Sequence, residues 1–298
     1  MTTPLHSSTS TRTLAEFEAL VQDIRPELHR YCARMIGSVV DAEDLVQEAL
    51  AKAYAALPTT SVANMRSWLF RIAHNKAIDY LRRANHQQME YLDEQALFAE
   101  PDPPLEQPEM VAVALSLFLK LAPKQRSCVI LKDVMGYSLA DISELLDATV
   151  GEIKAALHRG RTRLRELSKS VKADTPARLD EQERQLLARY IERFNARDFD
   201  AVRAMLADEV RLDLINRSTR RGLAEVGEYF HRYDEVDDWH LALGTVENRP
   251  AILVYDSRER SSRPTYFVLL TWEDARVSLI RDYRYAPYVI SEAVITKV

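Results

Sequence analysis

Cysteine and glycine are scarce in this chain, which has two and seven of them in 298 residues. Cys32 and Cys128 occur in helical patterns and in no C-x-x-C or Cys/His spacing. The sequence therefore excludes a disulfide framework and a zinc ribbon, and predicts two buried, small apolar side chains. The longest nearly apolar run, residues 110–119, is far too short to span a bilayer. Residues 1–13 have neither a basic start nor an apolar signal core, so we expect a cytoplasmic protein without a membrane segment.

An excess of positive charge is also missing, since 40 Lys and Arg residues stand against 45 Asp and Glu residues. The distribution along the chain is uneven. Residues 14–84 carry nine groups of each sign, residues 85–108 carry six acidic groups and no basic one, and residues 109–172 carry 11 basic and 7 acidic groups. Because local charge decides whether a surface meets phosphates, the net charge of −5 does not exclude a nucleic-acid partner.

Apolar residues recur at steps of three or four in the first part of the chain. This spacing predicts helices over residues 14–35, 41–57 and 65–83. Residues 85–108 break the pattern, because they are acidic and contain four prolines, and this composition predicts a flexible linker. Helical periodicity returns over residues 109–172.

The last part of the chain, residues 182–298, has a different pattern. Helical segments are predicted at 181–197, 199–207 and 223–233. Strands are predicted at 210–216, 241–247, 251–256, 265–272 and 277–285. Helices that come mostly before strands favour an α+β domain. We therefore expect a multidomain protein with two all-α domains, 14–84 and 109–172, and a C-terminal α+β domain.

A helix-turn-helix is predicted in the second all-α domain. Ser138 and Asp141 form a capping pair that starts its first helix. Asp147 suits a left-handed turn, and Thr149 with Glu152 is a capping box that opens the second helix. The outward face of this second helix is small and basic, which suits the major groove of DNA. The alternative is a solvated basic face on a three-helix bundle.

The helix predicted over residues 65–83 carries an aromatic and basic stripe. Its members are Trp68, Arg71, Asn75 and Arg82. An aromatic ring beside Arg and Asn can stack on an unpaired base and read its edge. The alternative places Trp68 in the core and leaves the arginines solvated.

The preceding helix has an acidic face made by Asp41, Asp44 and Glu48. Negative charge repels DNA, so this face does not bind nucleic acid. It is either plain surface or a docking face for a basic protein partner.

Taken in order, these pieces resemble the extracytoplasmic-function (ECF) type of RNA polymerase sigma factor. Three stretches carry the resemblance: DAEDLVQEAL at 41–50, WLFRIAHNKAIDYLRR at 68–83, and LAPKQRSCVILK at 121–132 followed by the helix-turn-helix. It covers residues 14–170. The resemblance implies a transcription initiation factor that binds core RNA polymerase and directs it to −10 and −35 promoter elements. Residues 14–84 then correspond to region 2 and residues 109–172 to region 4, with no catalytic residue, metal or cofactor.

The resemblance also implies roles for single residues. Core polymerase, at its β′ clamp, would be bound by Asp41, Asp44, Gln47 and Glu48, while the region 4-like domain would meet the β flap. The melted −10 strand would be engaged by Trp68, Arg71, His74, Asn75 and Arg82, with help from the loop 58–64. The −35 duplex would be contacted by Lys154, His158, Arg159 and Arg161.

Residues 182–298 resemble a SnoaL-like domain, the cone-shaped α+β fold shared with ketosteroid isomerases. The stretches 186–210 and 221–230 carry this resemblance, which implies a regulatory extension in contact with the sigma domains. Asp213, Tyr229, His231 and Trp239 are candidates to line its pocket. Strand alternation equally allows Asp213 to point outward on the side of Arg211.

Two other functions stay open at this point. The chain is a DNA-binding repressor without polymerase contact if charge reversal at Asp44 and Glu48 leaves its function intact. It is a SnoaL-type enzyme fused to a DNA-binding module if it turns over a bound ligand. The sequence does not indicate which small molecule, if any, the C-terminal domain binds.

Overall fold

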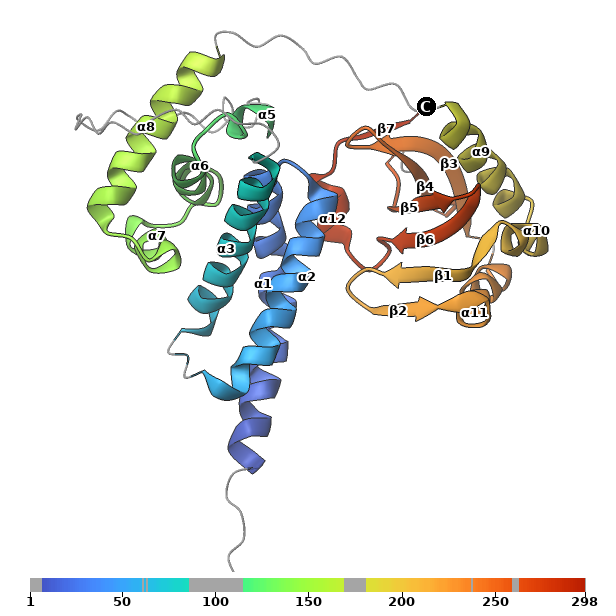
Figure 1. Cartoon of the computed structure of the whole chain (residues 1–298), viewed down its shortest axis with the longest axis horizontal. Helices are drawn as coiled ribbons and strands as arrows, with labels where there is room; N and C mark the ends of the chain where they lie inside the picture. The colour runs from blue at the N-terminus through green and yellow to red at the C-terminus, as the bar shows by residue number, and fades with distance from the viewer. Residues whose placement is uncertain are drawn as a thin grey trace, which may run out of the picture. The chain divides into compact units, whose positions relative to one another are not determined.

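The computed structural model divides into two compact units, residues 1–173 and 174–298 (Figure 1). It describes residues 7–60, 62, 64–85, 115–168, 181–236, 238–258 and 263–297. The linker predicted at 85–108 lies outside these residues except for its first position. Among the described helices, none is both long enough and apolar enough to cross a membrane.

Three helices begin the N-terminal unit, one for each predicted apolar stripe. They are α1 (Ser7–Ile36), α2 (Val39–Ala56) and α3 (Met65–Asn85), with a short 3-10 turn, η1 (Leu57–Thr59), after α2. Gly37 ends α1 with a φ of 82°, a conformation that glycine adopts without strain. Ser38 then caps α2 by accepting a hydrogen bond from the Asp41 amide at 3.1 Å. The three stripes meet in a core that contains Leu28, Val46 and Phe70.

The second half of this unit is a helix-turn-helix preceded by shorter helices. Its elements are α5 (Leu115–Phe118), α6 (Pro123–Val129), a π-helical turn η2 (Ile130–Val134), α7 (Leu139–Leu146) and α8 (Val150–Ser168). Ile142 and Leu145 of α7 are buried together with Ile153 and Leu157 of α8. This apolar seam holds the two helices of the motif together.

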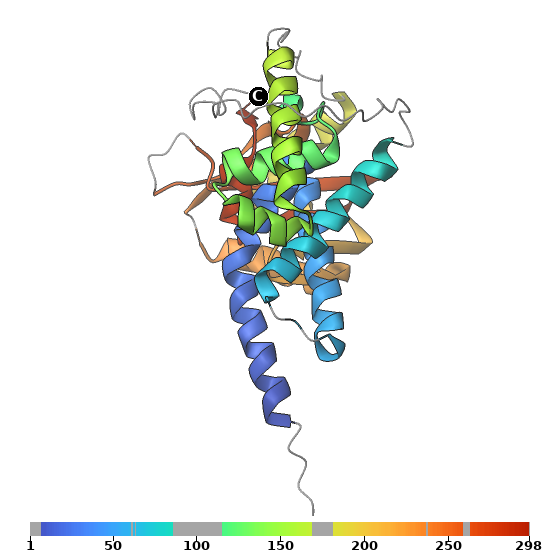
Figure 2. The same cartoon turned by 90° about the vertical axis from the view of Figure 1, so that its left-hand side faces the viewer.

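The two halves of the N-terminal unit pack on each other. Helix α7 lies on α3, and α6 and η2 lie on α1, so that the green helices cross in front of the blue and teal ones in Figure 2. The buried Arg126 guanidinium in α6 donates hydrogen bonds to the carbonyl oxygens of Met35 at the end of α1 and of Leu121. A buried hydrogen bond from the Tyr31 hydroxyl to Ser127 Oγ, at 3.0 Å, adds a second link. Sequence periodicity did not predict this packing.

The C-terminal unit is a seven-stranded sheet with helices packed on it. Its helices are α9 (Glu181–Asn195), α10 (Phe199–Ala204), α11 (Gly222–Asp234) and α12 (Pro287–Glu292). Its strands are β1 (Leu206–Leu214), β2 (Ser218–Arg221), β3 (Trp239–Val246), β4 (Arg249–Asp256), β5 (Tyr266–Glu273), β6 (Arg276–Asp282) and β7 (Ile295–Lys297). The strand order is β2-β1-β6-β5-β4-β3-β7, and β1 pairs with β6 in parallel while the other pairs are antiparallel.

Alternation along the strands decides which side chains face the helices. In β1, Leu212 and Leu214 join a core cluster with Phe194 of α9 and Phe230 of α11. Asp213, between them, therefore points to the opposite face of the sheet. This arrangement confirms the expected fold class, two helical parts followed by an α+β unit.

Candidate polymerase and nucleic-acid interfaces

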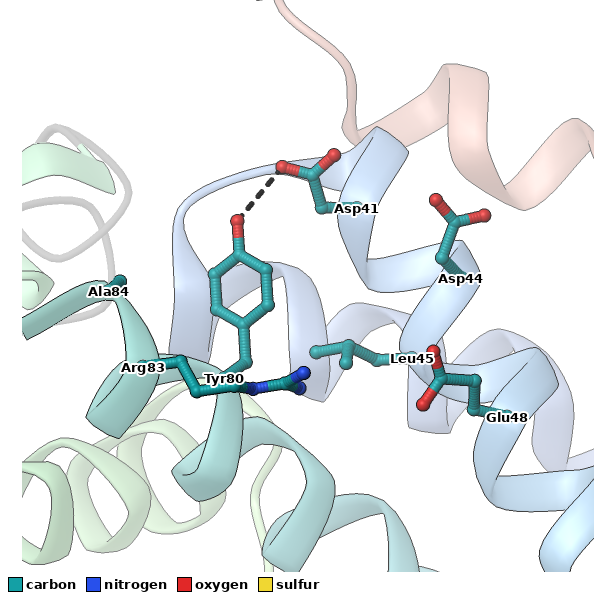
Figure 3. A pocket seen from close by; sticks show the side chains of 7 residues that line it. All are labelled: Asp41, Asp44, Leu45, Glu48, Tyr80, Arg83 and Ala84. Carbon is teal, nitrogen blue, oxygen red and sulfur yellow. Dashed lines mark hydrogen bonds between the residues drawn. The ribbon is translucent and has the colours of Figure 1, made fainter.

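The acidic face of α2 borders a surface hollow of about 490 Å³ (Figure 3). Asp41, Asp44 and Glu48 line it from α2, and Tyr80 and Arg83 line it from α3. The Tyr80 hydroxyl donates a hydrogen bond to Asp41 Oδ2 at 3.1 Å. Three of the four residues predicted to bind polymerase are thus brought to one concave acidic surface.

The other end of this acidic face is more exposed. The Glu48 carboxylate accepts a hydrogen bond from Lys76 Nζ at 2.6 Å, and the side chain of Gln47 is exposed but does not line the hollow. An exposed ion pair of this kind contributes little to stability, so Glu48 remains able to exchange partners.

Helix α3 presents its aromatic and basic residues with very different exposure. Asn75 and Arg82 are exposed, and Arg82 Nη1 lies 3.4 Å from Asp79 Oδ1 one turn earlier. Trp68 and Arg71 are half-buried. Of these four residues, the two nearer the C-terminus of α3 are therefore exposed, and the two nearer its N-terminus are partly covered.

His74 takes part in a buried hydrogen-bond network. Its Nδ1 lies 2.6 Å from the Tyr31 hydroxyl, which also donates to Ser127 Oγ. Burial lowers the pKa of His74 to about 4, so the imidazole is neutral at pH 7. In this conformation His74 links α3 to α1 and α6 and does not present a positive charge to solvent.

Asn64 caps the N-terminus of α3. The Asn64 side-chain oxygen accepts a hydrogen bond from the Ser67 amide at 3.1 Å, and its carbonyl accepts one from the Trp68 amide at 3.0 Å. The Asn64 side-chain nitrogen donates to Glu144 Oε1 of α7 at 2.7 Å. Glu144 is a residue that the sequence pattern did not single out.

The helix-turn-helix has the predicted local chemistry. Ser138 and Asp141 form a reciprocal capping box on α7, and Thr149 and Glu152 form the same arrangement on α8. Asp147 adopts the left-handed conformation, with a φ of 53°, in the turn between them. The hydrogen bonds from the Thr149 amide and from Lys124 Nζ lower the pKa of Glu152 to about 2, so this carboxylate stays charged at the positive end of α8.

The residues predicted to meet the −35 duplex lie along α8. Lys154 is exposed, and His158 and Arg159 are half-buried. The Arg161 guanidinium is engaged by Asp133 of η2, with Nε–Oδ2 and Nη2–Oδ1 distances of 2.9 and 2.5 Å. This hydrogen bonding raises the pKa of Arg161 and fixes its side chain against the helix-turn-helix core.

The interior of the C-terminal unit holds a polar cluster. The fully buried Asp282 carboxylate accepts hydrogen bonds from the Tyr229 hydroxyl and the Arg284 amide, both at 2.8 Å. The hydroxyls of Tyr233 and Tyr266 lie 2.6 Å apart beside it. Burial raises the pKa of Asp282 to about 6. Asp282 is thus a fully buried acid, and its signal in the sequence is an Asp at an inward position of a strand.

The four pocket candidates of this unit separate in the structure. Tyr229 lies in the interior cluster, and Trp239 is half-buried with its ring against Phe194. Asp213 lies on the other face, paired with Arg211, and His231 is exposed 3.8 Å from Glu235. Only Tyr229 contacts a carboxylate in the interior.

Metal-binding chemistry is not apparent in the part of the chain that the structure describes. No group of three or more His, Cys, Asp or Glu side chains is positioned to hold an ion there. Cys32 and Cys128 are both buried free thiols, as predicted.

Comparisons with known proteins cover both units. Residues 20–87 match the family sigma-70 region 2, and residues 113–164 match the family sigma-70 region 4. The ECF RNA polymerase sigma factor SigW of Bacillus subtilis is 34% identical over 164 residues, which are 50% of this chain and 87% of SigW.

Two solved structures extend the comparison. The extracytoplasmic-function sigma factor SigJ of Mycobacterium tuberculosis is similar over 90% of this chain and 95% of its own, with 21% identity and a TM-score of 0.33. An NTF2-like protein of unknown function from Cytophaga hutchinsonii is similar over 33% of this chain and 96% of its own, with 19% identity and a TM-score of 0.26.

Proposed function

Because the chain belongs to the ECF family of RNA polymerase sigma factors, we propose that it binds core polymerase through α2 and reads the −10 and −35 elements through α3 and α8. The observation that carries this assignment is the combination of surfaces in one unit. An acidic concave face on α2 adjoins a basic and aromatic helix, and a capped helix-turn-helix follows. Each surface has the chemistry that its proposed partner requires.

The −10 strand is assigned to α3. Trp68 offers a ring for stacking, Asn75 offers an amide for a base edge, and Arg71 and Arg82 offer charge to the backbone. His74 belongs to this set only when its bond to Tyr31 is broken. Asn64 contributes as the residue that starts α3, at the end of the loop before it.

The −35 duplex is assigned to α8. Lys154, His158 and Arg159 would contact the major groove and its phosphates, since they follow the capped N-terminus of a second helix in a helix-turn-helix. Arg161 supports them as a positioning residue, because its guanidinium is held by Asp133.

The polymerase surface is assigned to Asp41, Asp44, Gln47 and Glu48, with the β′ clamp as its partner. We expect Asp44→Arg together with Glu48→Arg to weaken core-polymerase binding at least about tenfold, through like-charge repulsion. Purified full-length variants and core polymerase, compared by fluorescence anisotropy, measure this loss. Glu18→Arg, an exposed charge reversal on α1, is the matched control and keeps wild-type affinity. A double variant with unchanged core affinity and function supports a repressor that lacks polymerase contact.

The C-terminal unit is proposed to be a regulatory, non-enzymatic part of the same factor. Its interior polar groups are largely satisfied by one another, since Tyr229 and the Arg284 amide both bind Asp282. Reconstituted transcription with core polymerase tests the whole assignment. The assignment is overturned if no genomic promoter supports promoter-specific initiation. Turnover of a ligand by the C-terminal unit would instead support an enzyme fused to a DNA-binding module.

A further inference from the structure

We propose that Glu144 of α7 is an intramolecular latch that closes the N-terminal unit and covers the −10-reading end of α3. This inference rests on the proposed role of α3, and it adds a closed state in which that role is blocked. In this state the helix-turn-helix occupies the surface that single-stranded DNA requires.

The contact consists of donors on α3 and acceptors on α7. Glu144 Oε1 accepts hydrogen bonds from Asn64 Nδ2 at 2.7 Å and from Ser67 Oγ at 2.9 Å. Arg71 Nη2 donates to the Glu144 carbonyl at 3.3 Å, and Arg71 Nη1 lies 3.8 Å from Asp147 Oδ2. A DNA backbone also offers only acceptors and negative charge to such donors, so it competes with α7 for the same groups.

The two proposed DNA contacts are incompatible with this closed state. The 25 positions between −35 and −10 span about 85 Å of duplex at about 3.4 Å per base pair. In the closed state, Arg71 of the −10-reading helix lies 3.8 Å from Asp147, in the turn that leads into α8. Both promoter elements are therefore reached together only after α7 leaves α3.

The position of the latch makes it suited to opening. Asn64, Glu144 and Asp147 are exposed, and exposed ion pairs and hydrogen bonds exchange readily with solvent and with other charged partners. The deeper contacts, such as the one between Tyr31 and Ser127, are buried and keep the halves associated until a partner separates them. Opening would also separate Ser127 Oγ of α6 from His74 Nδ1 of α3, which lie 3.5 Å apart at this interface.

The first test measures the distance between the two halves in the full chain. Spin labels at Ala55→Cys on α2 and Ala140→Cys on α7, both exposed positions, report separation by double electron–electron resonance. Cys32 and Cys128 are fully buried and label poorly. We expect Glu144→Ala to enlarge the long-distance population about three- to tenfold. Glu166→Ala, which removes an exposed acid of α8 paired only locally with Arg163, is the control and keeps the wild-type distribution.

The second test measures whether the latch masks DNA binding. We expect Glu144→Ala to bind a short fluorescein-labelled oligo(dT) strand about three- to tenfold more tightly than wild type and Glu166→Ala. Equal affinities of all three proteins overturn the proposal, and so does a distance distribution that Glu144→Ala leaves unchanged. The label distances do not depend on transcription, so failure of the latch is distinguishable from failure of the sigma-factor assignment.

Discussion

Asp282 is a single buried side chain with a consequence for the stability of the C-terminal unit. Burial raises its pKa to about 6, whereas an unfolded chain leaves an Asp near 4. Between these two pH values the folded protein keeps a proton that the unfolded chain releases. The free energy of unfolding contributed by this group therefore falls as the pH rises from about 4 to about 6, and is constant above that range. At about 1.4 kcal/mol per pH unit, the loss is about 3 kcal/mol.

We expect Asp282→Asn to remove this dependence, because the amide fills the same volume and does not ionise. The difference in free energy of unfolding, variant minus wild type, should therefore increase by about 2 to 3 kcal/mol from pH 4 to pH 7. Urea unfolding in a Trp68→Phe background, in which only Trp239 and Trp272 report by fluorescence, measures the difference. Asp274→Asn, at an exposed turn, is the control. A wild-type-to-variant difference that does not change with pH contradicts the prediction.

Single residues were predictable from sequence where the chemistry is local. The capping boxes at Ser138 and Thr149 and the left-handed turn at Asp147 follow from side chains three residues apart and from one tolerant residue type. Glu144 was not predictable, because its partner Asn64 lies 80 positions away. Asp282, at the end of β6, was missed because its polar partners are a tyrosine of α11 and a backbone amide.

At the scale of elements, a glycine sets how closely α6 and α8 approach. A Cβ added at Gly160 of α8 would lie 2.8 Å from Val129 Cγ2 and 3.4 Å from the Gln125 carbonyl oxygen. At Gly151, on the same helix, the nearest such atom is Thr149 Oγ1 at 4.0 Å. The two glycines therefore separate the effect of close packing from that of helix propensity.

We expect Gly160→Ala to destabilise the N-terminal unit by about 1 to 2 kcal/mol, because overpacking exceeds the gain in helix propensity. Gly151→Ala should instead stabilise it by about 0.5 kcal/mol, since the added methyl group meets no atom closer than ordinary van der Waals contact. Thermal unfolding followed by circular dichroism at 222 nm compares the two variants with wild type. The explanation is wrong if both substitutions shift the midpoint in the same direction.

Elements with a sustained period were predicted, and three short ones were missed. The three apolar stripes correspond to α1–α3, and the strand-like runs correspond to β1 and β3–β6. The missed elements, β2, α12 and β7, have four, six and three residues. A segment of this length carries too little periodicity to be recognised, and its conformation is decided by the strand or helix beside it. Val150 of α8 is 39% exposed, because it lies in the first turn of the helix, beyond the apolar seam.

At the scale of the whole molecule, the sequence indicated which surfaces exist but not which other elements join or cover them. The acidic face of α2 and the basic helix α3 were predicted as separate features, and the structure joins them in one hollow through Tyr80 and Asp41. The association of α7 with α3 depends on a few exposed polar contacts between distant segments. Periodicity and local charge contain no information on such contacts.

The C-terminal unit extends this charge argument to the complete chain. Residues 173–298 carry 19 basic and 23 acidic groups. We therefore expect this tethered, negatively charged unit to compete electrostatically with DNA for the basic surface of α8. We expect a chain that ends after Lys172 to bind duplex DNA about two- to fivefold more tightly than the full chain at low salt, with the difference vanishing at high salt. Fluorescence anisotropy over a salt series measures both affinities. A difference in affinity that persists at high salt would point to a specific contact between the C-terminal unit and α8. Equal affinities and equal transcription for the two chains remove the support for modulation by this unit.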